Sequence, residues 1–108
     1  MGHYEIFVYD SAKQDIRDAI EYISKTLRES ETAYNMLNRF REEIFSLADM
    51  PERYQIVSDC YLASLGFRVT SVGNYLIFYV VREKSNHVDI IRVLYGKRNW
   101  IELLKNGI

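Results

Sequence analysis

The fold is decided by the stretch from Gly66 to Leu104, GFRVTSVGNYLIFYVVREKSNHVDIIRVLYGKRNWIELL. It holds two runs rich in β-branched and aromatic residues, 67–72 and 75–82, and only Gly73-Asn74 separates them. Two such runs joined by two residues of this type predict a β-hairpin. A third run of the same character, 88–95, follows a polar turn, so the stretch predicts three consecutive antiparallel strands.

Pairing within these strands places arginines and tyrosines together. A two-residue turn puts Arg68 opposite Tyr79. The opposite charges of Arg82 and Asp89 favour a register in which these two residues pair, and this register also places Tyr79 opposite Arg92. Because side chains alternate between the two faces of a strand, Arg68, Tyr79 and Arg92 then form one row. Such a row suits the binding of phosphates, bases or a partner peptide. The alternative is the solvated side of an antiparallel sheet.

The face that carries this row, named the mixed face, also holds apolar residues that need covering. Its other members are Thr70, Tyr75, Ile77, Val81, Ile90 and Leu94. The opposite face, named the apolar face, carries Phe67, Val69, Leu76, Phe78, Val80, Ile91 and Val93. An uninterrupted apolar set of this kind predicts the side of the sheet that packs on the core.

The first half of the chain predicts one strand and a pair of helices. An alternating run at 4–9 indicates the strand. Ser11–Gln14 has the pattern of a capping box, and apolar residues then recur at helical spacing as far as Leu27. A second amphipathic helix is expected from Ser30 to Met50, where Pro51 ends it. The two helices predict an antiparallel hairpin that covers the apolar face.

Residues 52–65 are too apolar for a flexible linker and predict an ordered crossing with one short helical turn. A short apolar helix is expected after Gly96–Trp100. The expected order is therefore β-α-α-β-β-β-α, an α/β (α+β) fold with an N-terminal helical hairpin packed on an antiparallel sheet. No repeat or composition shift divides the chain, so residues 1–108 are expected to form one domain.

The composition of the chain excludes several classes of protein. The formal net charge of −1 argues against a generic nucleic-acid coat. Residues 1–53 hold 11 acidic and 7 basic residues, whereas residues 54–108 hold 4 and 7, so the positive charge belongs to the strands and the tail. The single cysteine, Cys60, excludes an internal disulfide and fits a reducing compartment. No apolar run reaches the roughly 18 residues that span a membrane, so a cytoplasmic location is expected, with no membrane partner.

The residue types needed for metal or cofactor chemistry are scarce. Two histidines and one cysteine form no metal-binding pattern, and there is no glycine-rich phosphate loop, so neither a metal nor a cofactor is expected. Cleavage of RNA through its 2′-hydroxyl needs a proton acceptor, a cation for the phosphorane and a proton donor. Cations and tyrosines are available, but no obvious base accompanies them. They are Arg68, Arg92, Lys97 and Arg98, with Tyr75, Tyr79 and Tyr95.

Several segments carry a family resemblance through their order and spacing. They are Pro51–Tyr54, Gly66–Arg68, Gly73–Tyr79 and Ile90–Trp100. Together they resemble the RelE/ParE superfamily of toxins from bacterial type II toxin–antitoxin, or plasmid stabilisation, modules, and the resemblance runs from about Tyr4 to Leu104. It implies a small toxin that inhibits growth and whose sheet and helical hairpin are wrapped by a cognate antitoxin peptide. It also implies one of two targets, since RelE-like members cut mRNA on the ribosome and ParE-like members poison DNA gyrase.

The resemblance assigns roles to some residues of this chain, and one catalytic residue of the family has no counterpart here. Arg68 lies where RelE-like toxins carry a catalytic lysine, Tyr75 lies near the place of a phosphate-binding arginine, and Arg98 matches a catalytic-type arginine. These three are the catalytic candidates only if the chain is a nuclease. The late catalytic tyrosine has no counterpart, since Leu103 and Leu104 occupy that region. This departure favours a ParE-like gyrase poison.

The surface expected to bind the target or RNA consists of Arg68, Tyr79, Arg92, Lys97, Arg98 and Trp100. Two alternatives to a gyrase poison stay open. One is a ribosome-dependent mRNA endonuclease, and the other is a decayed toxin that retains only antitoxin binding. Whether the chain is an enzyme therefore stays open as well.

Overall fold

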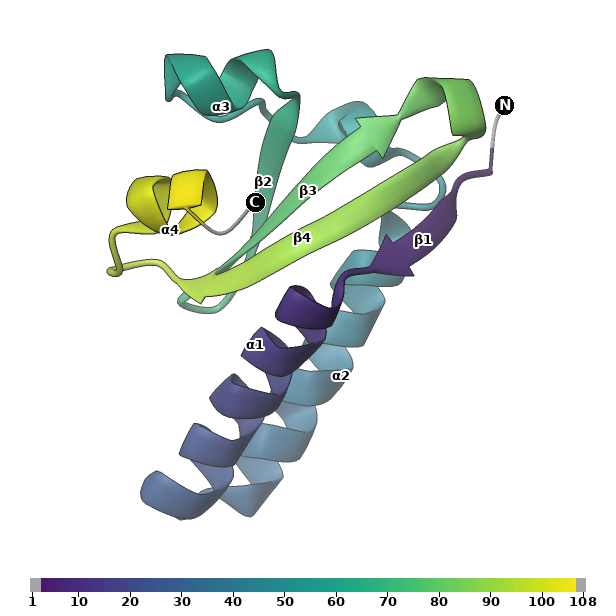
Figure 1. Cartoon of the computed structure of the whole chain (residues 1–108). Coiled ribbons are helices and arrows are strands. Elements are labelled where there is room, and N and C mark those ends of the chain that lie inside the picture. The colour runs from purple at the N-terminus through teal and green to yellow at the C-terminus, as the bar shows by residue number, and fades with distance from the viewer. Residues whose placement is uncertain (1–2, 107–108) are drawn as a thin grey trace.

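A computed structural model describes residues 3–106 and contains a four-stranded sheet with helices on both sides (Figure 1). The elements are β1 (Glu5–Val8), α1 (Asp10–Glu21), the π-helical turn η1 (Tyr22–Thr26), α2 (Ser30–Ser46), the 3-10 turn η2 (Pro51–Arg53), α3 (Cys60–Ser64), β2 (Phe67–Val72), β3 (Tyr75–Arg82), the 3-10 turn η3 (Glu83–Ser85), β4 (His87–Tyr95) and α4 (Trp100–Asn106). This order confirms the expected arrangement of strands and helices. Within residues 3–106, no helix has the length and apolar character needed to cross a membrane.

The sheet has the strand order β1-β4-β3-β2, in which β1 runs parallel to β4 and the other pairs are antiparallel. The predicted β2–β3 hairpin is confirmed, since Val72 pairs with Tyr75 and Arg68 pairs with Tyr79. Gly73 has a φ of +57° at the turn. Only glycine adopts this conformation without steric cost, which is why the turn forms at this dipeptide.

The predicted register between β3 and β4 is wrong. Arg82 pairs with His87, and Tyr79 pairs with Ile90 instead of Arg92. The connection closes more tightly than expected because η3 leads directly to Asn86, whose φ of 52° turns the chain into β4. A bulge after Phe78 then shifts the pairing, so that Phe78 lies opposite Arg92. The predicted row of Arg68, Tyr79 and Arg92 is therefore broken.

The helical hairpin covers the mixed face, which reverses the predicted packing. Ile77, Tyr79 and Ile90 of the sheet pack with Phe40 and Leu47 of the α2 segment in one buried cluster. Both faces are apolar enough to need burial, so the strand pattern did not decide between them. A polar contact also joins the mixed face to the hairpin, because the Thr70 hydroxyl donates a hydrogen bond to the Glu43 carboxylate of α2 at 2.8 Å.

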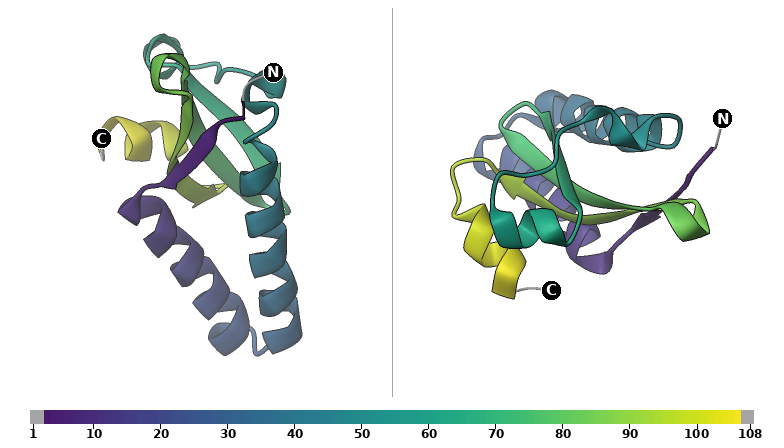
Figure 2. Two further views of the ribbon diagram at one scale, coloured as in Figure 1. Left: turned by 90° about the vertical axis from the view of Figure 1, so that its right-hand side faces the viewer. Right: turned by 90° about the horizontal axis from the view of Figure 1, so that it is seen from above.

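The apolar face is covered by α3 and α4, which lie on the side of the sheet opposite α2 (Figure 2, right). Leu62 of α3 and Leu104 of α4 pack against Phe67, Phe78 and Val80 in a second buried cluster. The bulge also exchanges two residues of β4 relative to the prediction. Val93 packs on the side of the helical hairpin, and Leu94 packs on the side of α3 and α4.

Residues 54–66 form the ordered crossing expected from their apolar content, including the short helix α3. The segment also pairs with the outer edge of β2, because Val57 donates its N–H to the Phe67 carbonyl and Val69 donates to the Gln55 carbonyl. The predicted capping box of the first helix does not form. Ser11 lies inside α1, and its hydroxyl donates to the Ile91 carbonyl of β4, which attaches the start of the helix to the sheet.

Candidate functional site

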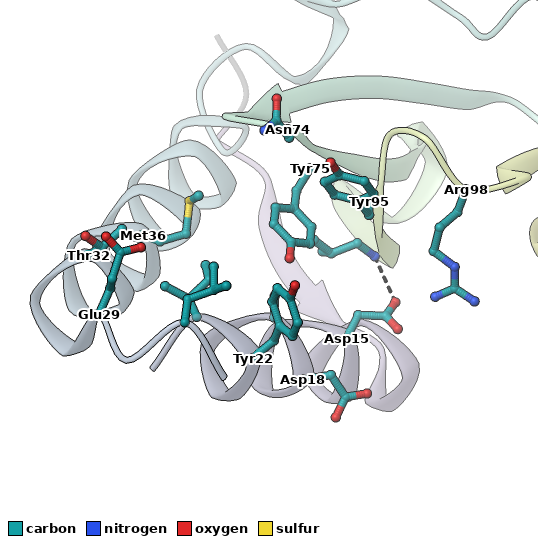
Figure 3. A pocket seen from close by; sticks show the side chains of 14 residues that line it. Asp15, Asp18, Tyr22, Glu29, Thr32, Met36, Asn74, Tyr75, Tyr95 and Arg98 are labelled. Carbon is teal, nitrogen blue, oxygen red and sulfur yellow. Dashed lines mark hydrogen bonds between the residues drawn. The ribbon is translucent and has the colours of Figure 1, made fainter. Parts of the chain in front are cut away.

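A cleft of about 710 Å³ lies where the helical hairpin passes the β2–β3 turn and the end of β4 (Figure 3). The cleft forms because α1 and α2 run past the end of the sheet instead of ending on it (Figure 1). Three tyrosines from three elements meet there: Tyr22 of η1, Tyr75 of β3 and Tyr95 of β4. The other lining residues are Asp15, Asp18, Ala19, Ile23, Leu27, Glu29, Thr32, Met36, Asn74, Val93 and Arg98.

The tyrosines of the cleft form an aromatic wall. The rings of Tyr75 and Tyr95 meet edge to face with centroids 5.6 Å apart, and Phe40 supports Tyr75 from the core at 5.7 Å. The hydroxyl of Tyr75 points toward Tyr22 (Figure 3). Burial raises the pKa of Tyr75, and the neighbouring Tyr95 and Tyr22 raise it further. Tyr75 therefore stays protonated at neutral pH, so it can donate a hydrogen bond or a proton but does not act as a base.

Asp15 of α1 forms the rim of the cleft and binds Arg92. The Arg92 guanidinium donates from Nε to Asp15 Oδ2 at 2.6 Å and from Nη2 to Oδ1 at 2.9 Å. The same carboxylate accepts the backbone N–H of Val93 at 2.9 Å. The hydrogen bond to Asp15 raises the pKa of Arg92 further above its ordinary value. Arg92 was predicted to face a ligand, but its guanidinium is engaged within the protein.

Lys97 and Arg98 lie in the turn between β4 and α4, and both are exposed. Neither forms an ion pair within residues 3–106. Arg98 borders the tyrosine cleft and also a second hollow of about 480 Å³. That second hollow is lined by Arg92, Arg98, Asn99, Glu102, Leu103 and Asn106. This turn therefore presents free positive charge beside an aromatic cleft.

Arg68 lies apart from the other two catalytic candidates. It occupies the end of the β2–β3 hairpin away from the turn, four residues before Val72, the partner of Tyr75. At about 3.3 Å per residue this separates it from Tyr75 by roughly 13 Å along the strand. Its guanidinium donates to the Tyr54 carbonyl at 2.7 Å and pairs with Glu52 at 3.8 Å. The structure thus brings Tyr75 and Arg98 together and leaves Arg68 out.

Tyr79 and Trp100 both pack against other residues of the protein, to different extents. Tyr79 has no exposed surface, and its hydroxyl donates to the Pro51 carbonyl at 2.6 Å. Its predicted place on a binding surface is wrong, because the helical hairpin covers the mixed face. Trp100 is partly buried, and its ring lies against Phe78 with centroids 5.1 Å apart.

Asp15 and Tyr22 also line the cleft, although neither was among the candidate residues expected from the sequence. Asp15 carried a usable signal: it lies three residues after Ala12 and four before Ala19, within the buried stripe of α1. A charged residue in such a stripe requires a partner. Tyr22 gave no signal, because its role depends on how far η1 extends past the sheet. Among the residues the structure describes, no cluster of three metal-ligating side chains exists.

The chain matches a protein-family model and is similar in fold to several solved structures. The family model described as the ParE toxin of type II toxin-antitoxin system, parDE, matches residues 6–100. The chain is similar to a chain of the chromosomal ParDE system from P. aeruginosa, with a TM-score of 0.72 and 12% identity over 88% of this chain and 98% of that one. A comparison with curated proteins gives no significant sequence match.

Two further solved structures share the fold. The RelBE2 toxin-antitoxin complex from Mycobacterium tuberculosis matches with a TM-score of 0.62 and 20% identity, covering 85% of this chain and 96% of that one. The isolated RelE toxin of E. coli matches with a TM-score of 0.57 and 14% identity, covering 97% and 99%. These identities are low, so the structural likenesses establish the RelE/ParE-type fold and nothing finer.

Proposed function

Because the chain belongs to the family of ParE toxins of type II toxin–antitoxin systems, we propose that it inhibits bacterial growth by poisoning DNA gyrase. The observation that supports a binding mechanism is the arrangement of the cations. Arg92 is held by Asp15, and Arg68 is held by Tyr54 and Glu52, away from the cleft. Lys97 and Arg98 form no ion pair within residues 3–106, and Arg98 lies beside the aromatic wall of the cleft. Charged and aromatic side chains of this kind are typical anchors of protein interfaces.

We also propose that a cognate antitoxin protein neutralises the chain. One of the similar structures is a toxin–antitoxin complex, and another is a ParDE system. The cleft offers apolar side chains at Ile23, Leu27 and Met36 between the two helices. Such a surface suits the nonpolar face of a partner peptide. Gyrase acts in the cytoplasm, so the proposal places the toxin there.

A supercoiling assay tests the gyrase proposal directly. Purified chain is titrated into gyrase acting on relaxed plasmid, and supercoiled and cleaved DNA are quantified. We expect supercoiling to fall and cleaved plasmid to accumulate as the chain is added. Supercoiling that stays unchanged at a large excess of folded chain would contradict the proposal.

Replacing Arg98 by alanine is expected to raise the concentration for half-inhibition of gyrase by roughly 30-fold, because truncating an arginine anchor at an interface costs about 2 kcal/mol. Arg98 is exposed and unpaired within the described residues, so the free energy of unfolding should change by less than about 0.5 kcal/mol. The matched control is Arg41→Ala, which removes an exposed arginine from α2. Equal inhibition by the two variants would exclude Arg98 from the working surface.

Ribosome-dependent mRNA cleavage is the second candidate, and one observation favours it. Tyr75 and Arg98 line the same cleft, so one cleft holds both a proton donor and a cation. Mapping of RNA 5′ ends after induced expression separates the two functions. Fresh cuts inside translated messages that disappear in both Tyr75→Phe and Arg98→Ala would establish the nuclease. Intact messages with DNA damage would support the gyrase proposal, and unimpaired growth would indicate a decayed toxin.

A further inference from the structure

Within residues 3–106, no strand pairs with the outer edge of β1. Glu5 and Tyr9 donate their backbone N–H groups inward, to the carbonyls of Asn86 and Ile90 beside and within β4. Because backbone groups alternate along a strand, the N–H and C=O groups of Ile6 and Val8 point outward. The N–H of Tyr4 is taken by the Ala48 carbonyl, so the open stretch runs from Glu5 to Tyr9. Figure 2 (left) shows no other element in front of this edge.

The two edges of the sheet differ in how they are protected. The outer edge of β2 is paired with residues 55–57, as described above. In the part of the chain that the structure describes, the β1 edge has no such cover, and the strand contains no lysine or proline, the residues that commonly block strand association. Phe7 is half exposed at its centre and Tyr9 is 38% exposed at its end. An open edge with exposed aromatic residues is suited to pairing with another strand.

We propose that two copies of this chain associate through their β1 strands to form one continuous eight-stranded sheet. A twofold axis at Phe7 makes the edge complementary to itself, as a closed dimer requires. Ile6 then faces Val8 of the second copy, and their outward groups form four backbone hydrogen bonds, two on each side of the axis. The two Phe7 rings face each other across the axis. The proposal does not depend on the gyrase function.

Side-chain chemistry favours a second copy over another extended segment. In the register centred on Phe7, the apolar Ile6 and Val8 of the two copies face each other on the hairpin side, while Glu5 lies opposite Tyr9, whose hydroxyl donates to Asp89 of its own chain at 3.4 Å. The pairing of Ile6 with Val8 occurs twice because of the symmetry. Glu5, Phe7 and Tyr9 lie on the side of the sheet away from the helical hairpin, since Ile6 and Val8 pack into the cluster on the hairpin side. The interface is short, so a weak, concentration-dependent dimer is expected.

Sedimentation velocity of the full chain from roughly 1 µM to 1 mM tests the association, a range that spans weak to moderate affinities. We expect the average mass to rise with concentration for the wild type and to stay monomeric for Phe7→Lys, which places two like charges at the axis. The matched control is Phe45→Lys, at a residue of α2 that is 64% exposed. It should associate as the wild type does. A wild type that stays monomeric throughout, or two variants that lose association equally, would overturn the proposal.

Cross-linking tests the register independently of affinity. The exposed Cys60 is first replaced by serine, and Phe7→Cys or Glu5→Cys is added to that background. Residues on the axis face each other in a non-hydrogen-bonded pair, whose spacing permits a disulfide. Under mild oxidation we expect at least tenfold more covalent dimer from Phe7→Cys than from Glu5→Cys, because Glu5 faces Tyr9 of the second copy. Equal yields would exclude the proposed register and leave this edge to an extended segment of another protein.

Discussion

Tyr79→Ala is expected to lower the free energy of unfolding by about 3 to 5 kcal/mol, the range for truncating a buried aromatic residue. The side chain has no exposed surface and fills the space between β3 and the helical hairpin. Tyr79→Phe should cost about 1 to 2 kcal/mol, since it leaves the carbonyl of the buried Pro51 without its donor. Urea denaturation measures both losses.

Tyr34→Phe serves as the control for the hydroxyl, because Tyr34 is 65% exposed on α2 and its substitution should change stability by less than about 0.5 kcal/mol. The two roles considered for Tyr79, binding the target and packing in the core, predict opposite results for Tyr79→Phe. A residue of a binding surface would lose target affinity in Tyr79→Phe and keep its stability. A buried residue loses stability and keeps affinity, and the reverse outcome would contradict the described packing.

Alkaline pH provides a second measurement on the same residue. Burial raises the pKa of Tyr79 to about 12, from an unfolded value of about 10. The folded state therefore holds this proton more tightly than the unfolded state does. The resulting stabilisation is fully present below pH 10 and is lost as the pH rises through 12, and its size is about 3 kcal/mol. This loss exceeds the advantage of about 1 to 2 kcal/mol that the wild type has over Tyr79→Phe at neutral pH, so the difference should fall to zero and reverse over this interval. A constant difference would contradict the raised pKa of Tyr79.

Asp15→Ala is expected to destabilise the protein by about 3 kcal/mol, because it leaves the guanidinium of Arg92 partly buried and without its counter-charge. The substitution also removes the acceptor for the Val93 N–H. Asp15→Asn keeps an oxygen in the same place and removes only the charge, so about half of this loss is expected. The free energies of unfolding are compared by urea denaturation at neutral pH.

The neighbouring Asp18 is the matched control. It lies on the same helix, is exposed and bonds only to Gln14 among the described residues. Asp18→Ala should therefore change stability by less than about 0.5 kcal/mol. Similar losses in the two alanine variants would show that Asp15 does not hold Arg92 in solution. A loss confined to Asp15 would also explain why Arg92 is unavailable to a target.

Part of the candidate site could be predicted from the chain. Arg98 and Lys97 were expected at a working surface because both are cations and Arg98 matches a catalytic-type arginine of the family that the chain resembles. The structure leaves both exposed, and Arg98 lines the cleft. Their role there stays a prediction. Arg68 and Tyr79 were placed on an open face because alternation separates two faces without saying which one the helices cover. Asp15 was missed because its partner, Arg92, lies 77 residues away.

Local chemistry determined the elements of this protein. The Gly73-Asn74 turn set the β2–β3 pairing, and periodic apolar residues set the helices, since both depend on neighbours along the chain. Only the tertiary structure decided which face each helix covers and where β4 shifts at its bulge. Those outcomes depend on contacts such as Glu43 with Thr70 and Asp15 with Arg92, between residues distant in sequence. These long-range contacts decide which of the two apolar faces the helical hairpin covers. The alternation of side chains along a strand carries no information about such contacts.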